Sequence, residues 1–155
     1  MLEKNQPAPG FTTVDQHGNS VSLADFHGKQ AVVLYFYPKD DTPGCTIEAN
    51  EFTALSAEFD AAGAKVLGVS ADSCSDHIAF IDKFELKIDL LADTSKEICN
   101  LYQTWGEQEW QGQKYMGINR ATFIIDKQGM LADVFYDVTA KGHAPAMLEI
   151  VKKLS

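Results

Sequence analysis

Apolar and polar residues follow two different periods along this chain, and the period changes at a few turn-forming residues. Residues 31–37 (AVVLYFY) form a continuous apolar run of β-branched and aromatic side chains, which predicts a strand buried on both faces. Residues 65–71 (KVLGVSA) predict a second strand. Between these runs, apolar residues recur at helical spacing, which predicts a helix that begins at Pro43 and ends at Gly63. A strand, a helix and a strand in this order predict parallel strands joined by a right-handed crossover.

The rest of the chain supplies hairpins and further helices. In chain order we predict a β-hairpin near 11–14 and 20–22, a helical turn at LADFHG, a helix at about 74–84, a short strand at DLLAD, a short helix at SKEICNLY, a hairpin of RATFIID and MLADVFYD, and an amphipathic helix at 144–154. Ser95 is the predicted N-cap of the SKEICNLY helix. Residues 103–118 are polar and punctuated by glycine, which predicts a loop or an irregular insertion. These elements predict a single α/β domain over residues 1–155, with a mixed central sheet and helices on both faces.

Composition and charge exclude several kinds of partner. The 13 basic and 22 acidic residues give a formal net charge of −9, which argues against nucleic acid and anionic membranes, because both attract clustered lysine and arginine. The N-terminal MLEKNQPAPG lacks the apolar core of a signal peptide, and no apolar run is long enough to span a bilayer. We therefore expect a soluble, cytoplasmic protein. The four histidines show no ligand spacing, so we expect no bound metal.

One of the three cysteines stands in a position that favours reactivity. Residues 38–45 (PKDDTPGC) follow the central strand, and they place Cys45 in the first turn of the predicted helix. A cysteine attacks as a thiolate, and a helix N-terminus or a nearby cation lowers the pKa of a thiol. Open α/β sheets place their sites at the carboxyl ends of strands, where this turn lies. Thr42 offers a hydroxyl group that can both donate and accept a hydrogen bond beside the sulfur, and it is also a candidate N-cap.

The two aspartates of the same segment oppose this chemistry. The carboxylates of Asp40 and Asp41 would raise the pKa of a neighbouring thiol. A reactive Cys45 therefore requires both side chains to point outward and a cation to arrive from elsewhere in the chain. Arg120, at the head of the strand RATFIID, is the best candidate, because a guanidinium stays charged and presents a fork of donors. The alternative for Arg120 is a surface ion pair.

The spacing Pro-x-x-x-Thr-x-x-Cys, formed by Pro38, Thr42 and Cys45, resembles the active-site signature of peroxiredoxins. The surrounding YFYPKDDTPGCTIEANEF is similar to the peroxiredoxin Q, or bacterioferritin comigratory protein, subfamily. The similarity covers nearly the whole chain, including APGFTTVDQHGNSVSLADFHGK, VLGVSAD and YMGINRATFIID. The resemblance implies a thioredoxin-like fold with an N-terminal β-hairpin extension. It also implies reduction of hydrogen peroxide and alkyl hydroperoxides without a metal or an organic cofactor.

The resemblance also implies a role for each matching residue. Cys45 is expected to be the thiolate that attacks the peroxide, and Thr42 to position that peroxide. Pro38 is expected to shield the sulfur. Arg120 is expected to hold the thiolate and the leaving oxygen, and Glu48 to support Arg120.

The sequence departs from the subfamily in the second half of the reaction. Asn50 and Ile81 occupy the positions where relatives carry a cysteine that resolves the oxidised sulfur. Three routes remain: an external thiol such as thioredoxin reduces Cys45 directly; Cys74, at the same predicted sheet edge, forms a disulfide with it; or Cys99 or an intermolecular bond takes this role. We expect a monomer or a weak homodimer.

Two classes of function fit these observations. The first is a thiol peroxidase that acts through Cys45. The alternative is a thioredoxin-fold binding or chaperone protein with a non-catalytic thiol. A thioredoxin-type reductase is disfavoured, because no Cys-x-x-Cys is present and position 42 is threonine. A purely structural, buried Cys45 is also disfavoured, because a helix start after TPG is a poor position for burial.

Overall fold

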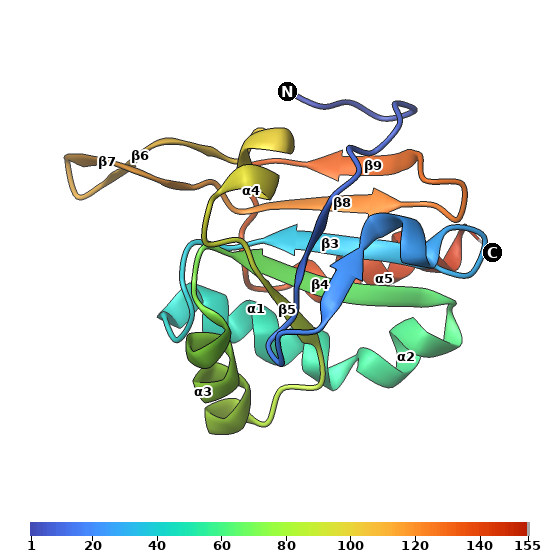
Figure 1. The fold of residues 1–155 in the computed structure, drawn as a ribbon, viewed down its shortest axis with the longest axis horizontal. Coiled ribbons are helices and arrows are strands. Elements are labelled where there is room, and N and C mark those ends of the chain that lie inside the picture. The colour runs from blue at the N-terminus through green and yellow to red at the C-terminus, as the bar shows by residue number, and fades with distance from the viewer. Residues whose placement is uncertain (155) are drawn as a thin grey trace.

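A mixed sheet forms the centre of the computed structural model, which describes residues 1–154 (Figure 1). Its strands are β3 (Ala31–Phe36), β4 (Ala64–Ser70), β5 (Asp89–Ala92), β8 (Ala121–Ile125) and β9 (Leu131–Phe135). Their order across the sheet is β5-β4-β3-β8-β9. Strands β3, β4 and β5 run parallel, whereas β8 is antiparallel to both β3 and β9. The predicted parallel pair and the predicted late hairpin are both confirmed.

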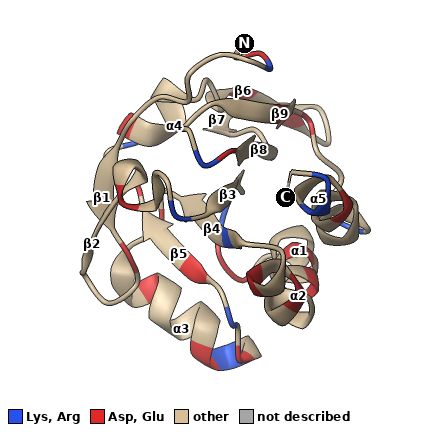
Figure 2. Cartoon of the chain, turned by 90° about the vertical axis from the view of Figure 1, so that its right-hand side faces the viewer, with Lys and Arg blue, Asp and Glu red and all other residues tan. Residues whose placement is uncertain are grey.

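Helices and the N-terminal hairpin cover the two faces of the sheet. One face packs against α1 (Pro43–Ala54), α2 (Ser56–Ala61), α3 (Cys74–Phe84) and α5 (His143–Lys152). The other face packs against α4 (Glu97–Leu101) and the N-terminal segment with β1 (Thr12–Val14), β2 (Ser20–Ser22) and the 3-10 helix η1 (Leu23–Phe26). Figure 2 shows these layers from the side. Within residues 1–154, no helix combines the length and the apolar character that crossing a membrane requires.

Strand β3 is apolar at every position because it contributes to both cores. Val33 and Tyr35 belong to the core on the α1 side, whereas Val32, Leu34 and Phe36 belong to the core on the other side. A strand covered on both faces reads as a continuous apolar run rather than an alternation. The sequence pattern therefore identified the middle of the sheet.

The register of the strands brings three distant segments to one edge of the sheet. Phe36, the last residue of β3, pairs with Ala121, the first residue of the antiparallel β8. The residue before β8, Arg120, therefore lies at the edge where β3 ends and α1 begins. Strand β4 runs parallel to β3, so α3 also begins at this edge.

Two local predictions about helices are wrong. The segment between residues 43 and 63 forms two helices, because Leu55 leaves the helical conformation with φ −101° and ψ 7°. Ser95 is not the N-cap of α4; this position belongs to Lys96. The carboxylate of Asp93 is buried and accepts hydrogen bonds from the backbone N–H groups of Ile98 (3.1 Å) and Cys99 (2.8 Å). The Ser95 hydroxyl still accepts from the backbone N–H of Glu97 over 3.3 Å, so serine and aspartate share the helix-start donors.

Residues 103–118 also differ from the prediction. They contain a β-hairpin of β6 (Trp105–Trp110) and β7 (Gln113–Ile118), which extends away from the central sheet at the left of Figure 1. Its strands are exposed along most of their length, so they lack the alternation of apolar and polar residues that reveals a strand. The turn residues Gln111 (φ 50°) and Gly112 (φ 77°) both adopt the left-handed conformation that a tight two-residue hairpin needs.

Candidate active site

Cys45 lies in the first turn of α1, with its side chain against the sheet. Only 1% of the residue is exposed, and it packs in the same apolar core as Tyr35 and Phe52. The expectation that this position is poor for burial is therefore wrong. The Cys45 side of this turn packs against the core that includes Tyr35 of β3, so the sulfur lies on the inner side of the helix.

The guanidinium of Arg120 lies beside the sulfur of Cys45. Arg120 is the only arginine in the sequence, and its side chain is 15% exposed. Its Nη2 atom lies 3.4 Å from the Sγ atom of Cys45, and its Nη1 atom donates to Oε1 of Glu48 over 2.6 Å. The two arms of one planar fork thus join the sulfur and the carboxylate.

Burial and charge shift the pKa values of Glu48 and Arg120, beside Cys45, in opposite directions. Burial raises the pKa of Glu48 to about 7, although the charge and the hydrogen bond of Arg120 lower it. Its second oxygen, Oε2, has no hydrogen-bond partner among residues 1–154. Burial lowers the pKa of Arg120, but Cys45 and Glu48 together raise it above its ordinary value. A fixed positive charge therefore faces the sulfur of Cys45.

Gly44 makes room for this guanidinium. A Cβ atom added at Gly44 would lie 2.9 Å from Nη2 of Arg120, which is closer than such atoms approach. The glycine is helical, so its role here is the close approach of the arginine rather than an unusual backbone angle. Sequence reasoning missed this residue, because Thr-Pro-Gly reads as turn chemistry.

Replacing Gly44 with alanine tests this close packing. We expect Gly44→Ala to displace the guanidinium from Cys45 and to slow oxidation of the protein by peroxide about tenfold, since misplacing a catalytic group is costly. Folding stability should stay level or rise, because alanine favours a helix over glycine by about 0.5–1 kcal/mol. Stopped-flow oxidation and thermal unfolding measure the two effects. Gly106→Ala, where an added Cβ meets no atom within 4 Å, is the matched control. An unchanged oxidation rate in Gly44→Ala would contradict this role.

Thr42 and Pro38 belong to the segment that leads from β3 to Cys45. The Thr42 hydroxyl donates a hydrogen bond to the carbonyl of Lys39 over 2.8 Å, and the side chain makes no capping bond. Thr42 stands at the N-cap position of α1, as predicted, but its hydroxyl is used outside the helix. Because its proton is already engaged, only the lone pairs of its oxygen remain for a further hydrogen bond. Pro38 is exposed and follows Tyr37 at the end of β3.

The two aspartates differ in their surroundings. Asp41 is exposed and pairs with Lys83 of α3 over 2.8 Å, as an outward-pointing residue should. Asp40 is only 8% exposed, and its Oδ2 atom lies 2.6 Å from Nδ1 of His77. The expectation that both carboxylates point outward is therefore wrong for Asp40, whose carboxylate meets a buried imidazole. His77 has no predicted role, because the four histidines of the sequence follow no motif.

The other two cysteines lie in contrasting positions. Cys74 is partly buried at the start of α3, and its Sγ atom donates to the carbonyl of Asp15 over 3.3 Å. Cys99 is fully buried in the core on the opposite side of the sheet from Cys45. Burial, reinforced by Asp93, raises the pKa of Cys99 well above its ordinary value. Only Cys74 therefore shares the sheet edge at which Cys45 lies.

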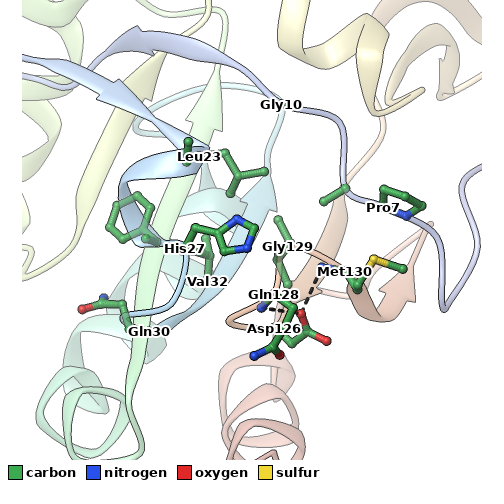
Figure 3. A pocket seen from close by; sticks show the side chains of 14 residues that line it. Pro7, Gly10, Leu23, His27, Gln30, Val32, Asp126, Gln128, Gly129 and Met130 are labelled. Carbon is green, nitrogen blue, oxygen red and sulfur yellow. Dashed lines mark hydrogen bonds between the residues drawn. The ribbon is translucent and has the colours of Figure 1, made fainter.

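A separate cavity lies at the far end of the sheet. It has a volume of about 270 Å³ and lies beside the start of β3, where Leu23, Val32, His27 and Gln128 contribute to its wall (Figure 3). None of the three cysteines lines it. The end of the sheet at which Cys45 lies is thus distinct from this cavity.

Comparison with known proteins agrees with the geometry. Residues 5–134 match the AhpC/TSA family. The bcp protein of Helicobacter pylori strain J99 is 48% identical over 148 residues, which cover 96% of this chain and 97% of the relative. Peroxiredoxin Bcp of Bacillus subtilis is 40% identical over 154 residues, covering 99% and 98% of the two chains.

Solved structures of peroxiredoxin Q proteins are also similar to this chain. Peroxiredoxin Q of Xanthomonas campestris superposes with a TM-score of 0.86 at 37% identity, covering 92% of this chain and 90% of that one. A PrxQ mutant of Xylella fastidiosa superposes with a TM-score of 0.92 at 29% identity, covering 99% and 97%. The predicted thioredoxin-like fold is confirmed. The chain therefore belongs to the AhpC/TSA family and is a peroxiredoxin, a thiol peroxidase, of the Bcp or peroxiredoxin Q type.

Proposed function

We propose that Cys45 is the residue that hydroperoxides oxidise in this peroxiredoxin, and that its substrates are hydrogen peroxide and alkyl hydroperoxides. The observation that carries the proposal is the position of Arg120. Its fork joins Sγ of Cys45 to the buried carboxylate of Glu48 at the start of α1. A relative from Xanthomonas campestris has been studied for alkyl peroxide reduction, which supports the substrate class.

The reaction follows from the charges at this site. The thiolate of Cys45 attacks the nearer peroxide oxygen, so that a sulfur–oxygen bond forms while the oxygen–oxygen bond breaks. The leaving oxygen takes the electron pair and then a proton, which gives water or an alcohol, and Cys45 becomes a sulfenic acid. Fixed donors aimed at the developing charge lower the barrier most effectively. Arg120 supplies such donors, and the free lone pairs of Thr42 accept the hydrogen of the incoming hydroperoxide. We keep the shielding role of Pro38 as part of this proposal.

Recycling requires a second thiol and a movement of α1. Because Cys45 is 1% exposed, the thiol of another protein reaches its sulfur only when the first turn of α1 opens. We propose that an external thiol such as thioredoxin reduces the sulfenic acid: one thiol displaces water to form a disulfide, and a second thiol releases Cys45. Cys74 is the internal alternative, because it is partly exposed and begins a helix at the same sheet edge. Cys99 lies across the sheet, which opposes the third route.

Locating the oxygen after a single turnover tests these assignments. We expect one equivalent of hydrogen peroxide to leave a trapped sulfenic acid on Cys45 in wild type, Cys74→Ser and Cys99→Ser, and none in Cys45→Ser. Mass spectrometry of peptides after trapping measures this. Oxygen on another cysteine in wild type would refute the assignment of Cys45. An intrachain disulfide that disappears only in Cys74→Ser would replace the external route with the internal one.

A further inference from the structure

A buried hydrogen-bonded cluster lies behind the segment that leads to Cys45. The imidazole of His77, on α3, is fully buried. Its Nδ1 atom lies 2.6 Å from Oδ2 of Asp40, and its Nε2 atom lies 2.9 Å from the carbonyl oxygen of Leu91. The Tyr37 hydroxyl donates to the other oxygen of Asp40 over 2.5 Å. The cluster therefore joins the end of β3 to both α3 and β5.

The partners of His77 fix its protonation. A backbone carbonyl only accepts, so Nε2 carries a hydrogen toward Leu91. A carboxylate also only accepts, so Nδ1 carries a hydrogen toward Asp40. Both ring nitrogens therefore donate, and the ring is an imidazolium. Burial lowers the pKa of His77, but the hydrogen bond and the charge of Asp40 raise it more, and Asp72 adds to the increase.

The same cluster holds the backbone before α1. The backbone N–H of Asp40 donates to Oδ2 of Asp72 over 2.9 Å, and the Ser70 hydroxyl donates to the same oxygen over 2.7 Å. Atoms of Asp40, Asp72 and His77 that could bind a metal ion lie within 4.8 Å of one another. Both nitrogens of His77 already face protein acceptors, however, so internal hydrogen bonds account for the cluster.

The backbone at this point needs such support. Asp41 has φ 57°, which is the left-handed conformation that residues other than glycine adopt at a cost. It lies four residues before Cys45, and the anchored Asp40 directly precedes it. Contacts from His77 of α3 and from Asp72, just after β4, thus hold the chain in a turn that it does not prefer by itself.

We propose that His77, as an imidazolium paired with Asp40, is a positioning residue that holds residues 38–45 and so keeps Cys45 beside Arg120. The inference rests on the proposed function of Cys45. His77 does not touch the sulfur or the peroxide; it acts through Asp40. Loss of the pair leaves α1 free to open at its first turn, which separates Sγ from the guanidinium and exposes the sulfur. Two rates then change in opposite directions. Oxidation of Cys45 by small peroxides becomes slower, and modification of Cys45 by bulky thiol-reactive reagents becomes faster.

Two variants and a matched control test this role. His77→Gln removes the ring charge, and Asp40→Asn removes its counter-charge. We expect each variant to slow oxidation by hydrogen peroxide at least about tenfold, since loss of alignment at a catalytic group is costly. We expect an aromatic disulfide reagent to modify Cys45 at least about tenfold faster, with peptide mapping to separate Cys45 from Cys74. Lys83→Gln breaks the exposed pair with Asp41 between the same two elements, and both rates should stay within about twofold, as for a surface ion pair.

The outcomes separate this inference from the proposed function. The reagent arm uses no peroxide, so it reports the opening of α1 even if Cys45 is not the oxidised residue. Nitrogen NMR of the wild-type protein should show both nitrogens of His77 protonated at neutral pH, and it decides the matter if the variants do not fold. Folded variants with both rates within about twofold of wild type would overturn the proposal. A neutral His77 at neutral pH would overturn it as well.

Discussion

Replacing Arg120 with methionine should slow oxidation of Cys45 by hydrogen peroxide about 100- to 1000-fold, the usual effect of removing one fixed donor from a developing oxyanion. The structure gives the physical reason, since Nη2 of Arg120 lies 3.4 Å from Sγ and no other arginine is present to replace it. Arg120→Lys should fall between wild type and Arg120→Met. Lysine keeps a point charge, but it cannot extend a planar fork to both the sulfur and Glu48. Stopped-flow measurement of the second-order rate constant compares the three proteins.

Controls separate this effect from a general loss of charge or of stability. Lys114→Met removes an exposed cation on the β6–β7 hairpin, and its rate should match wild type. The double variant Glu48→Gln/Arg120→Met removes the carboxylate that Arg120→Met leaves buried without its cation. It should fold better than the single variant and react just as slowly. A rate in Arg120→Met within about threefold of wild type would contradict the role of the guanidinium.

Replacing Glu48 with glutamine should change the dependence of stability on pH. Burial raises the pKa of Glu48 to about 7 from its ordinary value of 4.5. A carboxyl group whose folded pKa is raised contributes its stabilisation fully below the unfolded pKa, and this contribution is lost as the pH rises through the folded pKa. One pKa unit corresponds to about 1.4 kcal/mol, so wild type should lose about 3 kcal/mol from this group between about pH 4.5 and pH 7. Glutamine does not titrate, so Glu48→Gln should gain stability relative to wild type over this range.

Chemical denaturation at several pH values measures this difference. Both proteins should carry Cys45→Ser, so that no thiol beside residue 48 is oxidised during the measurement. His143 works in the opposite sense, because burial lowers its pKa to about 4, and its stabilisation is lost as the pH falls. Both proteins contain His143, so its effect cancels in the comparison. A stability difference that stays constant from pH 5 to pH 8 would contradict the raised pKa of Glu48.

The main features of the fold follow from local patterns in the sequence. Residues 31–37 identified the central strand, because burial on both faces requires an apolar residue at every position. The position of Cys45 in the first turn of a helix followed from Pro43, which suits the start of a helix. The sequence left two interpretations of Arg120 open, a position beside Cys45 and a surface ion pair. No pattern in the sequence gives the register between β3 and β8, which decides between them. That register alone brings residue 120 to the end of β3.

The remaining features depend on contacts between distant segments. The burial of Cys45 follows from how α1 packs on the sheet, and a helix-start position gives no sign of it. The pairing of Asp40 with His77 joins residues 37 positions apart, and neither belongs to a local motif. The β6–β7 hairpin shows no alternation of apolar and polar residues because both of its faces meet solvent along most of its length. The turn-forming pair Gln111 and Gly112 is the sequence feature from which this hairpin could have been predicted.

The most direct test of the central claim compares Cys45 inside and outside its folded site. The measurement is the rate at which peptides mapped to Cys45 gain oxygen from hydrogen peroxide at neutral pH, in the native protein and in the same protein unfolded by denaturant. The unfolded chain keeps the thiol but loses both the helix start and Arg120. We predict that the native Cys45 reacts at least about 1000-fold faster than the unfolded one. Equal rates in the two states, or faster oxidation of Cys74 than of Cys45 in the native protein, would contradict the account.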